Sequence, residues 1–164
     1  MESSISTLAV LAEVTIGFVA FSAIVAALRV SFGQKLMPFQ MLLVQFFTVT
    51  GMITVSVVLL PLVLLEFWQE ELIVAKYATY YTLAAATSYF LYYIRQRTGI
   101  KAPTPLPSLF VMVGYGAWLS VFAVVATGIH WQPSLGLIAA IGFWGLFSSA
   151  VIFIYFLAEF VTPG

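Results

Sequence analysis

The sequence predicts an all-α protein of the polytopic membrane class, a single bundle of five transmembrane helices within its 164 residues. Hydrophobic residues make up 63% of the chain and charged residues only 7%, which leaves too little polar surface for a water-soluble domain. Five long apolar stretches follow one another, and a helix needs about 20 residues to cross a bilayer. The five spans therefore leave no room for a separate soluble domain.

The first span is predicted over residues 5–28. It ends before Arg29 and the turn-forming segment 31–35, which a helix in lipid would avoid. No basic stretch precedes the apolar run, so we expect a permanent helix rather than a cleaved signal peptide.

The second span is predicted over residues 39–65, after Pro38, a residue that suits the start of a helix. It is longer than a bilayer requires, so we expect a tilt or a bend, and Pro61 marks one place for it. The third span, over residues 72–94, carries tyrosines near both ends, as the two interfacial belts of a membrane helix require.

Alternate prolines in residues 101–107 disfavour a helix and favour an extended spacer. The fourth span follows over residues 108–129, and a tight turn at residues 130–134 leads to the fifth, over residues 135–160. Because this connection is short, the last two helices should form an antiparallel hairpin.

Basic residues predict the orientation, because cytoplasmic connections carry the excess of Lys and Arg. The first and third connections hold Arg29, Lys35, Arg95, Arg97 and Lys101. Only Lys76 lies near the second connection, and the fourth has no basic residue. We therefore expect the N-terminus outside and the C-terminus inside.

Glu13 is the most informative single residue, since it lies about 5 Å from the midpoint of the first span. An ionised carboxylate in hydrocarbon costs at least about 2.5 kcal/mol and persists only with a partner, water or a proton. Ala9 and Gly17 share its helical face, where a neighbouring helix could approach closely. Glu13 then lines an ion or proton pathway, or is protonated and bonds between helices, or lies at the interface of a helix that starts later.

The second span adds polar candidates to this pathway. Gln45 and Thr48 share one face, while Thr50 and Thr54 share another. Such groups either line a water-filled path or form hydrogen bonds between helices. Gln45 and Thr48 are further pathway candidates, and Gln45 is a candidate partner of Glu13.

Two charged connections are further candidate sites. If several copies surround a pore, Glu66, Glu70 and Glu71 would form a ring of carboxylates that concentrates cations at its outer mouth; otherwise they are a solvated loop. The basic inner face named above would contact anionic lipid, a cytoplasmic partner or a polyanion, or serve only to fix the topology. The formal net charge is zero, so we expect no sequence-specific binding of nucleic acid.

Small residues predict where helices pack, because they let backbones approach closely in lipid. The candidates are Gly17, Gly114, Gly142, Gly145 and Ser149. The last three share one stripe of the fifth span. In a homo-oligomer, one such stripe would be a contact between copies.

Catalytic and metal motifs are lacking in this sequence. It has no Cys, and its one histidine, His130, cannot build a metal site alone. We find no phosphate-binding glycine loop or nucleophile elbow either. The sequence therefore predicts no enzymatic activity, no metal and no cofactor.

The stretch LAEVTIGFVAF at residues 11–21 resembles the opening helix of small bacterial multi-pass inner-membrane proteins of unassigned function. In size and in lacking a soluble domain, the chain is also similar to membrane effectors of bacterial anti-phage systems, such as the Hailong-type channel effector. This second resemblance implies a role in anti-phage defence, in which oligomers permeabilise the inner membrane when a partner releases them.

Together these features lead us to expect a homo-oligomeric, ion-conducting membrane protein with Glu13 on or beside the pathway. A partner or ligand at the basic inner face would gate it. Two alternatives stay open: a non-conducting membrane scaffold or accessory subunit of a larger complex, and a small carrier that works as a dimer.

Overall fold

The computed structural model describes residues 2–31, 37–100, 103–129 and 131–161, and the fold is all-α. No strand occurs within these ranges. The five helices, in chain order, are α1 (Glu2–Ser31), α2 (Pro38–Phe67), α3 (Glu71–Thr98), α4 (Leu106–Thr127) and α5 (Leu135–Val161). The sequence thus predicts the number of helices correctly, and α2 continues without a break through Gly51 and Pro61.

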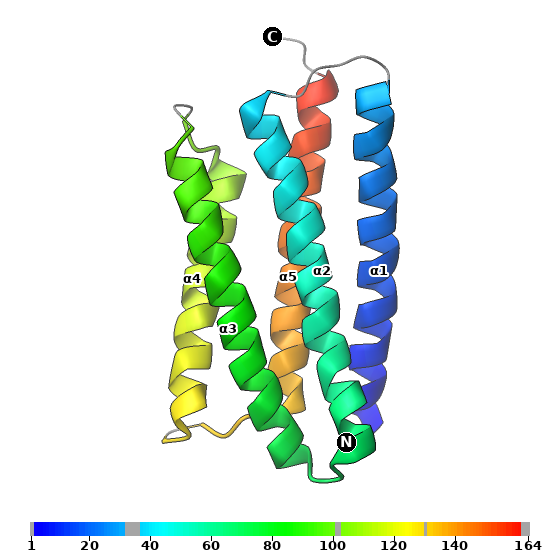
Figure 1. Ribbon diagram of the computed structural model, residues 1–164, viewed down its shortest axis with the longest axis vertical. Helices are drawn as coiled ribbons and strands as arrows, with labels where there is room; N and C mark the ends of the chain where they lie inside the picture. Colours follow the sequence, from blue (N-terminus) through cyan, green and yellow to red (C-terminus); the bar gives the residue numbers. More distant parts are fainter. Residues whose placement is uncertain (1, 32–36, 101–102, 130, 162–164) are drawn as a thin grey trace.

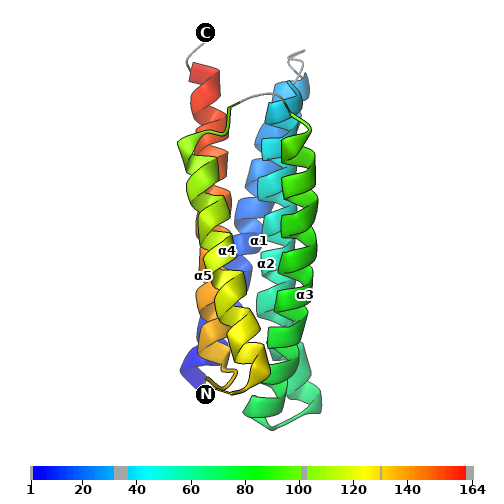
Figure 2. The same ribbon diagram turned by 90° about the vertical axis from the view of Figure 1, so that its left-hand side faces the viewer.

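The helices run alternately up and down, so each is antiparallel to the next in the chain (Figure 1). Helices α1, α2 and α3 follow one another across one layer, and α5 and α4 form a second layer (Figure 2). The most extensive contacts join α2 to α1 and to α5, whereas α4 makes fewer contacts with α3 and α5. The predicted antiparallel hairpin of the last two helices is present, but α5 packs mainly on α2.

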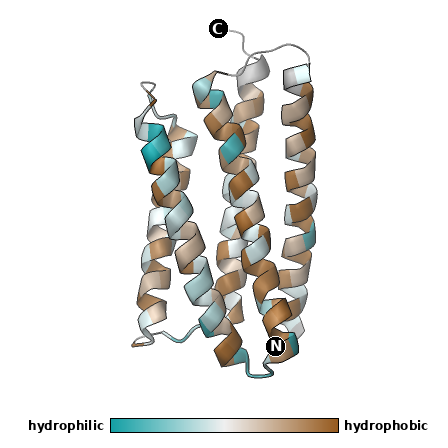
Figure 3. Ribbon diagram, viewed as in Figure 1, coloured by the Kyte–Doolittle hydropathy of each residue, from teal (hydrophilic) through white to brown (hydrophobic). Residues whose placement is uncertain are grey.

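Four of the five helices are long and apolar enough to cross a membrane: α1, α2, α4 and α5. The protein is therefore an integral membrane protein. Helix α3 has the length of a span, but its ribbon carries more hydrophilic colour than that of α1 (Figure 3). Three of its tyrosines form hydrogen bonds with α2: Tyr81 Oη donates to Ser56 Oγ at 2.9 Å, Tyr89 Oη donates to the Gln45 carbonyl at 3.3 Å, and Gln45 Nε2 donates to Tyr92 Oη at 2.9 Å.

The ends of α4 differ from the prediction by two residues on each side. Pro107 lies in the first turn, where its missing N–H removes no helical hydrogen bond, so the helix begins before the last proline of the spacer. At the other end Gly128 adopts a left-handed conformation with φ 67°, which ends the helix before Ile129. Ser134 accepts from the backbone N–H of Leu137 and so caps the start of α5.

The buried apolar residues form two clusters at different depths. One cluster, at the end where α1 begins, comprises Leu8, Ala12, Val57, Val58, Val74, Ala75, Ala78, Phe122, Leu135, Ile138 and Ile141. The other, at the opposite end, comprises Ala26, Leu42, Leu43, Phe46, Phe47, Tyr93, Val111, Ile152, Phe153 and Phe156. Buried hydroxyl residues, including Thr50, Thr54, Thr82 and Ser148, lie between the two.

Glycines permit the closest approaches between helices, as the sequence predicts for α4 and α5. A Cβ at Gly142 would overlap the side chain of Val58, and one at Gly145 would overlap Thr54. Ser149 is fully buried and donates to the carbonyl of Gly145 at 2.8 Å. The stripe on α5 is therefore occupied by α2 of the same copy.

Gly17 does not share this role. A Cβ there would meet nothing within 4 Å, because Gly17 lies on the exposed side of α1. Its predicted packing role therefore has no partner inside one copy of the described chain.

A matched pair of substitutions tests close packing on α4. Gly114→Ala should lower the free energy of unfolding by about 1–3 kcal/mol, because the new methyl group would overlap the Trp144 ring. Gly116→Ala, two residues away, has nothing within 4 Å and should be neutral or stabilising. Thermal unfolding of both variants in the same detergent measures the difference, and equal midpoints would contradict the packing.

Candidate functional site

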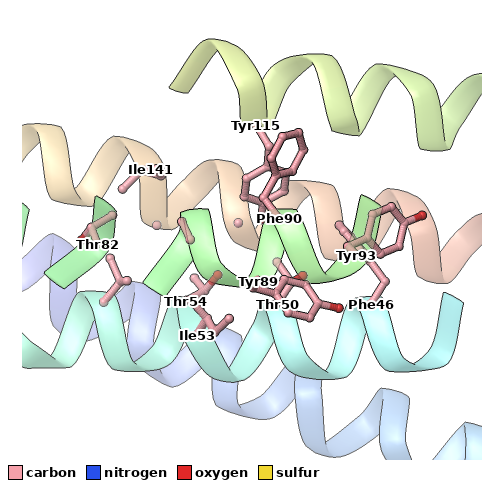
Figure 4. Close-up of a pocket in the computed structure, with 14 residues that line it drawn as sticks. Phe46, Thr50, Ile53, Thr54, Thr82, Tyr89, Phe90, Tyr93, Tyr115 and Ile141 are labelled. Carbon is pink, nitrogen blue, oxygen red and sulfur yellow. The ribbon is translucent and has the colours of Figure 1, made fainter. Parts of the chain in front are cut away.

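Two places in the bundle hold polar groups for which the apolar core offers no partner. The first is a cavity near the middle of the bundle, bounded by 14 residues of α2, α3, α4 and α5. Figure 4 shows Thr50 and Thr54 of α2, Thr82 and Tyr89 of α3, and Tyr115 of α4 around it. We refer to this space as the mid-bundle cavity.

The hydroxyl groups around the mid-bundle cavity differ in the hydrogen bonds that they form. Tyr115 Oη and Ser148 Oγ are 3.1 Å apart, and Tyr89 Oη donates to the Gln45 carbonyl at 3.3 Å. The Thr50 hydroxyl interacts with the hydroxyls of Tyr89 and Tyr115, whereas the buried Oγ1 of Thr82 has no hydrogen-bond partner among the described residues. An unsatisfied buried hydroxyl costs about 1–3 kcal/mol.

Three small residues, Gly142, Gly145 and Ala86, form part of the wall of this cavity. The space open to the centre of a water-sized sphere is about 30 Å³, enough for about two water molecules. None of the 14 surrounding residues is charged.

The second place is the side of α1 that faces away from the bundle, which we call the outer α1 face. Its residues recur at alternating intervals of three and four, and all are exposed: Ser3, Ser6, Val10, Glu13, Gly17, Ala20, Ile24, Ala27 and Ser31. Six of these nine are Ser, Gly or Ala. A repeat of seven residues with small side chains is typical of a helix that packs along a second helix.

Glu13 lies in the middle of the outer α1 face. Its side chain is exposed, and it has no hydrogen-bond or ion-pair partner among the described residues. The predicted contact with Gln45 does not occur inside one copy. Val19 packs on Gly51, and the helices are antiparallel, so the levels of Glu13 and Gln45 differ by about 18 Å along the axis.

The other pathway candidates lie on α2. Gln45 bonds to Tyr92 of α3, as described above, and Thr48 is half-buried. The neighbouring pair Thr50 and Thr54, which the sequence places on a different face, is the pair that borders the mid-bundle cavity.

The acidic candidates lie together at the end of the bundle where α1 begins. Glu66 is exposed near the end of α2, Glu70 precedes α3, and Glu71 is in its first turn. This placement agrees with a common connection between α2 and α3.

Arg95 and Arg97, the basic candidates whose side chains the structure describes, lie near the opposite end of the bundle and differ in exposure. Arg95 is exposed, but Arg97 is only 6% exposed. Its guanidinium donates to the Ile100 carbonyl and to Thr104 Oγ1, both at 3.0 Å, and lies 5.3 Å from the Phe39 ring. Arg97 therefore holds the connection from α3 to α4. Lys35, Lys101 and the side chain of Arg29 lie outside the described part of the chain.

Among the described residues, no group of three or more His, Cys, Asp or Glu side chains comes together that could hold a metal ion. His130 lies outside the described residues.

Comparisons with protein-family models, with curated proteins and with solved structures found no match to this chain. The candidate sites are therefore judged on their own geometry.

Sequence reasoning missed most of the mid-bundle cavity. Thr50 and Thr54 are recognisable as a polar pair on α2, but the residues that face them on other helices, Thr82, Tyr89 and Tyr115, carry no signal of that proximity. The tyrosines of α3 have the spacing of interfacial belts, yet Tyr93 is only 2% exposed. The low apolarity of α3 is the available clue that part of it faces polar groups.

Removal of the Arg97 guanidinium tests its structural role. Arg97→Gln should destabilise the connection between α3 and α4 by about 2 kcal/mol, because it breaks two hydrogen bonds from a charged donor. The exposed control Arg95→Gln should have little effect. The rate of proteinase K cleavage within residues 99–105 measures this opening. Equal cleavage of the two variants would show that Arg97 does not hold the connection.

Proposed function

We propose that the protein is a homo-oligomeric ion channel whose copies associate along the outer α1 face and conduct ions between them, past Glu13. The observation that carries this proposal is the exposed carboxylate of Glu13, the one charged residue in the apolar segment Ser3–Leu28 of α1. Inside one copy this carboxylate has no partner among the described residues. It therefore needs water, a proton or a neighbouring copy.

Lipid contact alone is an unfavourable environment for Glu13. The residue lies about 5 Å from the middle of α1, where an ionised carboxylate costs at least about 2.5 kcal/mol. Association of copies along α1 would remove the carboxylate from lipid. If the copies surround an axis, the same association would give it water.

The small residues beside Glu13 support a second copy as the occupant of this face. Gly17 and Ala20 leave the backbone of α1 accessible for close packing, and no helix of the same copy covers them. The glycine stripe of α5, the other candidate, already packs on α2. The outer α1 face is thus the better candidate for a contact between copies.

The acidic connection would lie near one entrance of such a path. Glu66, Glu70 and Glu71 are at the end of the bundle where α1 begins (Figure 1). They would raise the local concentration of cations there. On the orientation predicted from basic residues, this entrance is extracellular, and the opposite end would meet a gating partner or ligand.

A scaffold is the second candidate function, favoured by the same small-residue repeat. In that case Glu13 is protonated, hydrogen-bonds between copies and only holds them together. Both functions require association through α1, and conduction separates them.

Association through α1 can be tested by disulfide crosslinking, because the chain has no cysteine. Gly17→Cys adds a side chain where nothing lies within 4 Å, so the fold should be unaffected. In oxidised membranes this variant should form dimers, since helices packed at this face bring the Cβ atoms within about 4.5 Å. Val113→Cys, on the exposed side of α4, is the control. Equal crosslinking at both positions would reject the outer α1 face as the interface.

Conduction past Glu13 can be tested by ion flux into liposomes. Glu13→Gln should reduce cation flux at least about tenfold at matched oligomeric state, because a neutral amide attracts cations weakly. Glu71→Gln changes a carboxylate near the start of α3 and should alter the flux at most about twofold. If neither the original protein nor Glu13→Gln conducts, while Gly17→Cys crosslinks in both backgrounds, the scaffold function is favoured.

A further inference from the structure

Polar side chains are unevenly distributed along the outer α1 face. The half where α1 begins carries Ser3, Ser6 and Glu13. After Glu13, the next polar side chain on this face is that of Ser31, about 27 Å further along the helix. A path along the outer α1 face would therefore pass from a polar half into a long apolar half.

Ile24 has the largest side chain of the apolar half. The other residues there are Gly17, Ala20 and Ala27, whose side chains are a hydrogen atom or a methyl group. Ile24 is 59% exposed, so most of its side chain extends from the bundle instead of packing inside it. It lies about 17 Å from Glu13 along the helix axis. The narrowest part of the apolar half is therefore expected at Ile24.

The neighbouring Phe21 is also large and exposed, but its ring is directed elsewhere. It makes an edge-to-face contact with the ring of Phe153 on α5, with the centroids 5.9 Å apart. Because Phe153 is buried, this contact holds the Phe21 ring on the α5 side of α1. Phe21 therefore does not replace Ile24 as the obstacle in the path.

Val10, the other β-branched residue of the outer α1 face, has different surroundings. It is 55% exposed, but Ser6 and Glu13 lie within about one turn on either side of it. A narrow passage excludes water where its lining is apolar, and nearby polar groups oppose this exclusion. Val10 is therefore a weaker barrier to ions than Ile24.

Symmetry determines how the Ile24 side chains of several copies would meet. Copies related by rotation about one axis carry the same residue at the same depth. The outer α1 face points toward that axis in the proposed channel. One Ile24 side chain from each copy would thus contribute to a single apolar ring.

We propose that this ring of Ile24 side chains is the gate of the channel. In the closed state the side chains meet and exclude water, and conduction requires them to separate. The gate rests on the proposed function, because it lies on the same path as Glu13. On the orientation predicted from basic residues, the ring is near the inner end, where a gating partner or ligand would act.

Substitution of Ile24 tests the gate through cation flux into liposomes at matched oligomeric state. Ile24→Ser should raise the flux at least about fivefold, because a small hydroxyl side chain removes the apolar barrier to water. Ile24→Phe keeps a large apolar side chain and should not raise it. Addition of Glu13→Gln to Ile24→Ser should lower the raised flux at least about tenfold, since both residues act on one path.

Matched controls separate the gate from a general loosening of α1. Ile16→Ser makes the same change at a position that is 50% exposed but lies beside the outer α1 face, and should alter the flux at most about twofold. Val10→Ser should also stay within about twofold. Crosslinking of Gly17→Cys should persist with Ile24→Ser, which would show that the copies remain associated.

Three results would overturn the gate. Unchanged flux in Ile24→Ser, while Glu13→Gln lowers the flux of the original protein, would reject the gate and retain the channel. Equal increases from Ile24→Ser and Ile16→Ser would mean that flux follows loosening of α1 and not the ring. Absence of flux from the original protein and from every variant would reject the proposed channel, and the gate with it.

Discussion

Close approach of helix backbones is the interaction on which the rest of this bundle depends. Apolar side chains gain little by exchanging lipid for one another, so helices in a membrane associate where small residues allow close contact. In this protein those contacts join α2 to α1 and to α5. Val19 of α1 packs on Gly51, while Val58 and Thr54 of α2 pack on Gly142 and Gly145 of α5. Helix α4 makes its close contact differently, with the ring of Trp144 on Gly114. Helices α1, α2 and α5 are therefore the most closely packed part of the bundle, and the mid-bundle cavity lies beside this part.

This arrangement leaves polar groups on opposite sides of the closely packed helices. Towards α3 and α4, the buried hydroxyl of Thr82 has no hydrogen-bond partner among the described residues, and no charged residue borders the mid-bundle cavity. Away from the bundle, Glu13 is exposed among small residues on α1. That face suits another copy of the chain, because nothing in the same copy covers it. Helices α2 and α5 lie between the two places.

The sequence predicts the helices well because a span is a local property, read from an apolar run and the charges or prolines that end it. The helix ends were less predictable: α1 and α3 extend up to three and four residues beyond the predicted spans, Pro107 is tolerated in the first turn of α4, and Gly128 ends that helix early. Most contacts between helices could not be predicted from the sequence. Nothing in the order of residues indicates that Thr82 and Tyr115 border the same cavity as Thr50. Arg97 has the pattern of a loop cation, although it is buried against Phe39 and Thr104. Small residues predicted packing on α4 and α5 but did not reveal that Gly17 faces outward.

An odd number of helices places the start of α1 and the end of α5 at opposite ends of the bundle (Figure 1). If all five helices cross a membrane, these two points face different compartments. Two copies joined head to tail by a soluble linker would thus insert with opposite polarity. A tandem gene fusion could preserve a common polarity only if its linker supplied one more crossing helix. Duplication of this bundle within a single polypeptide is consequently harder than assembly from separate chains.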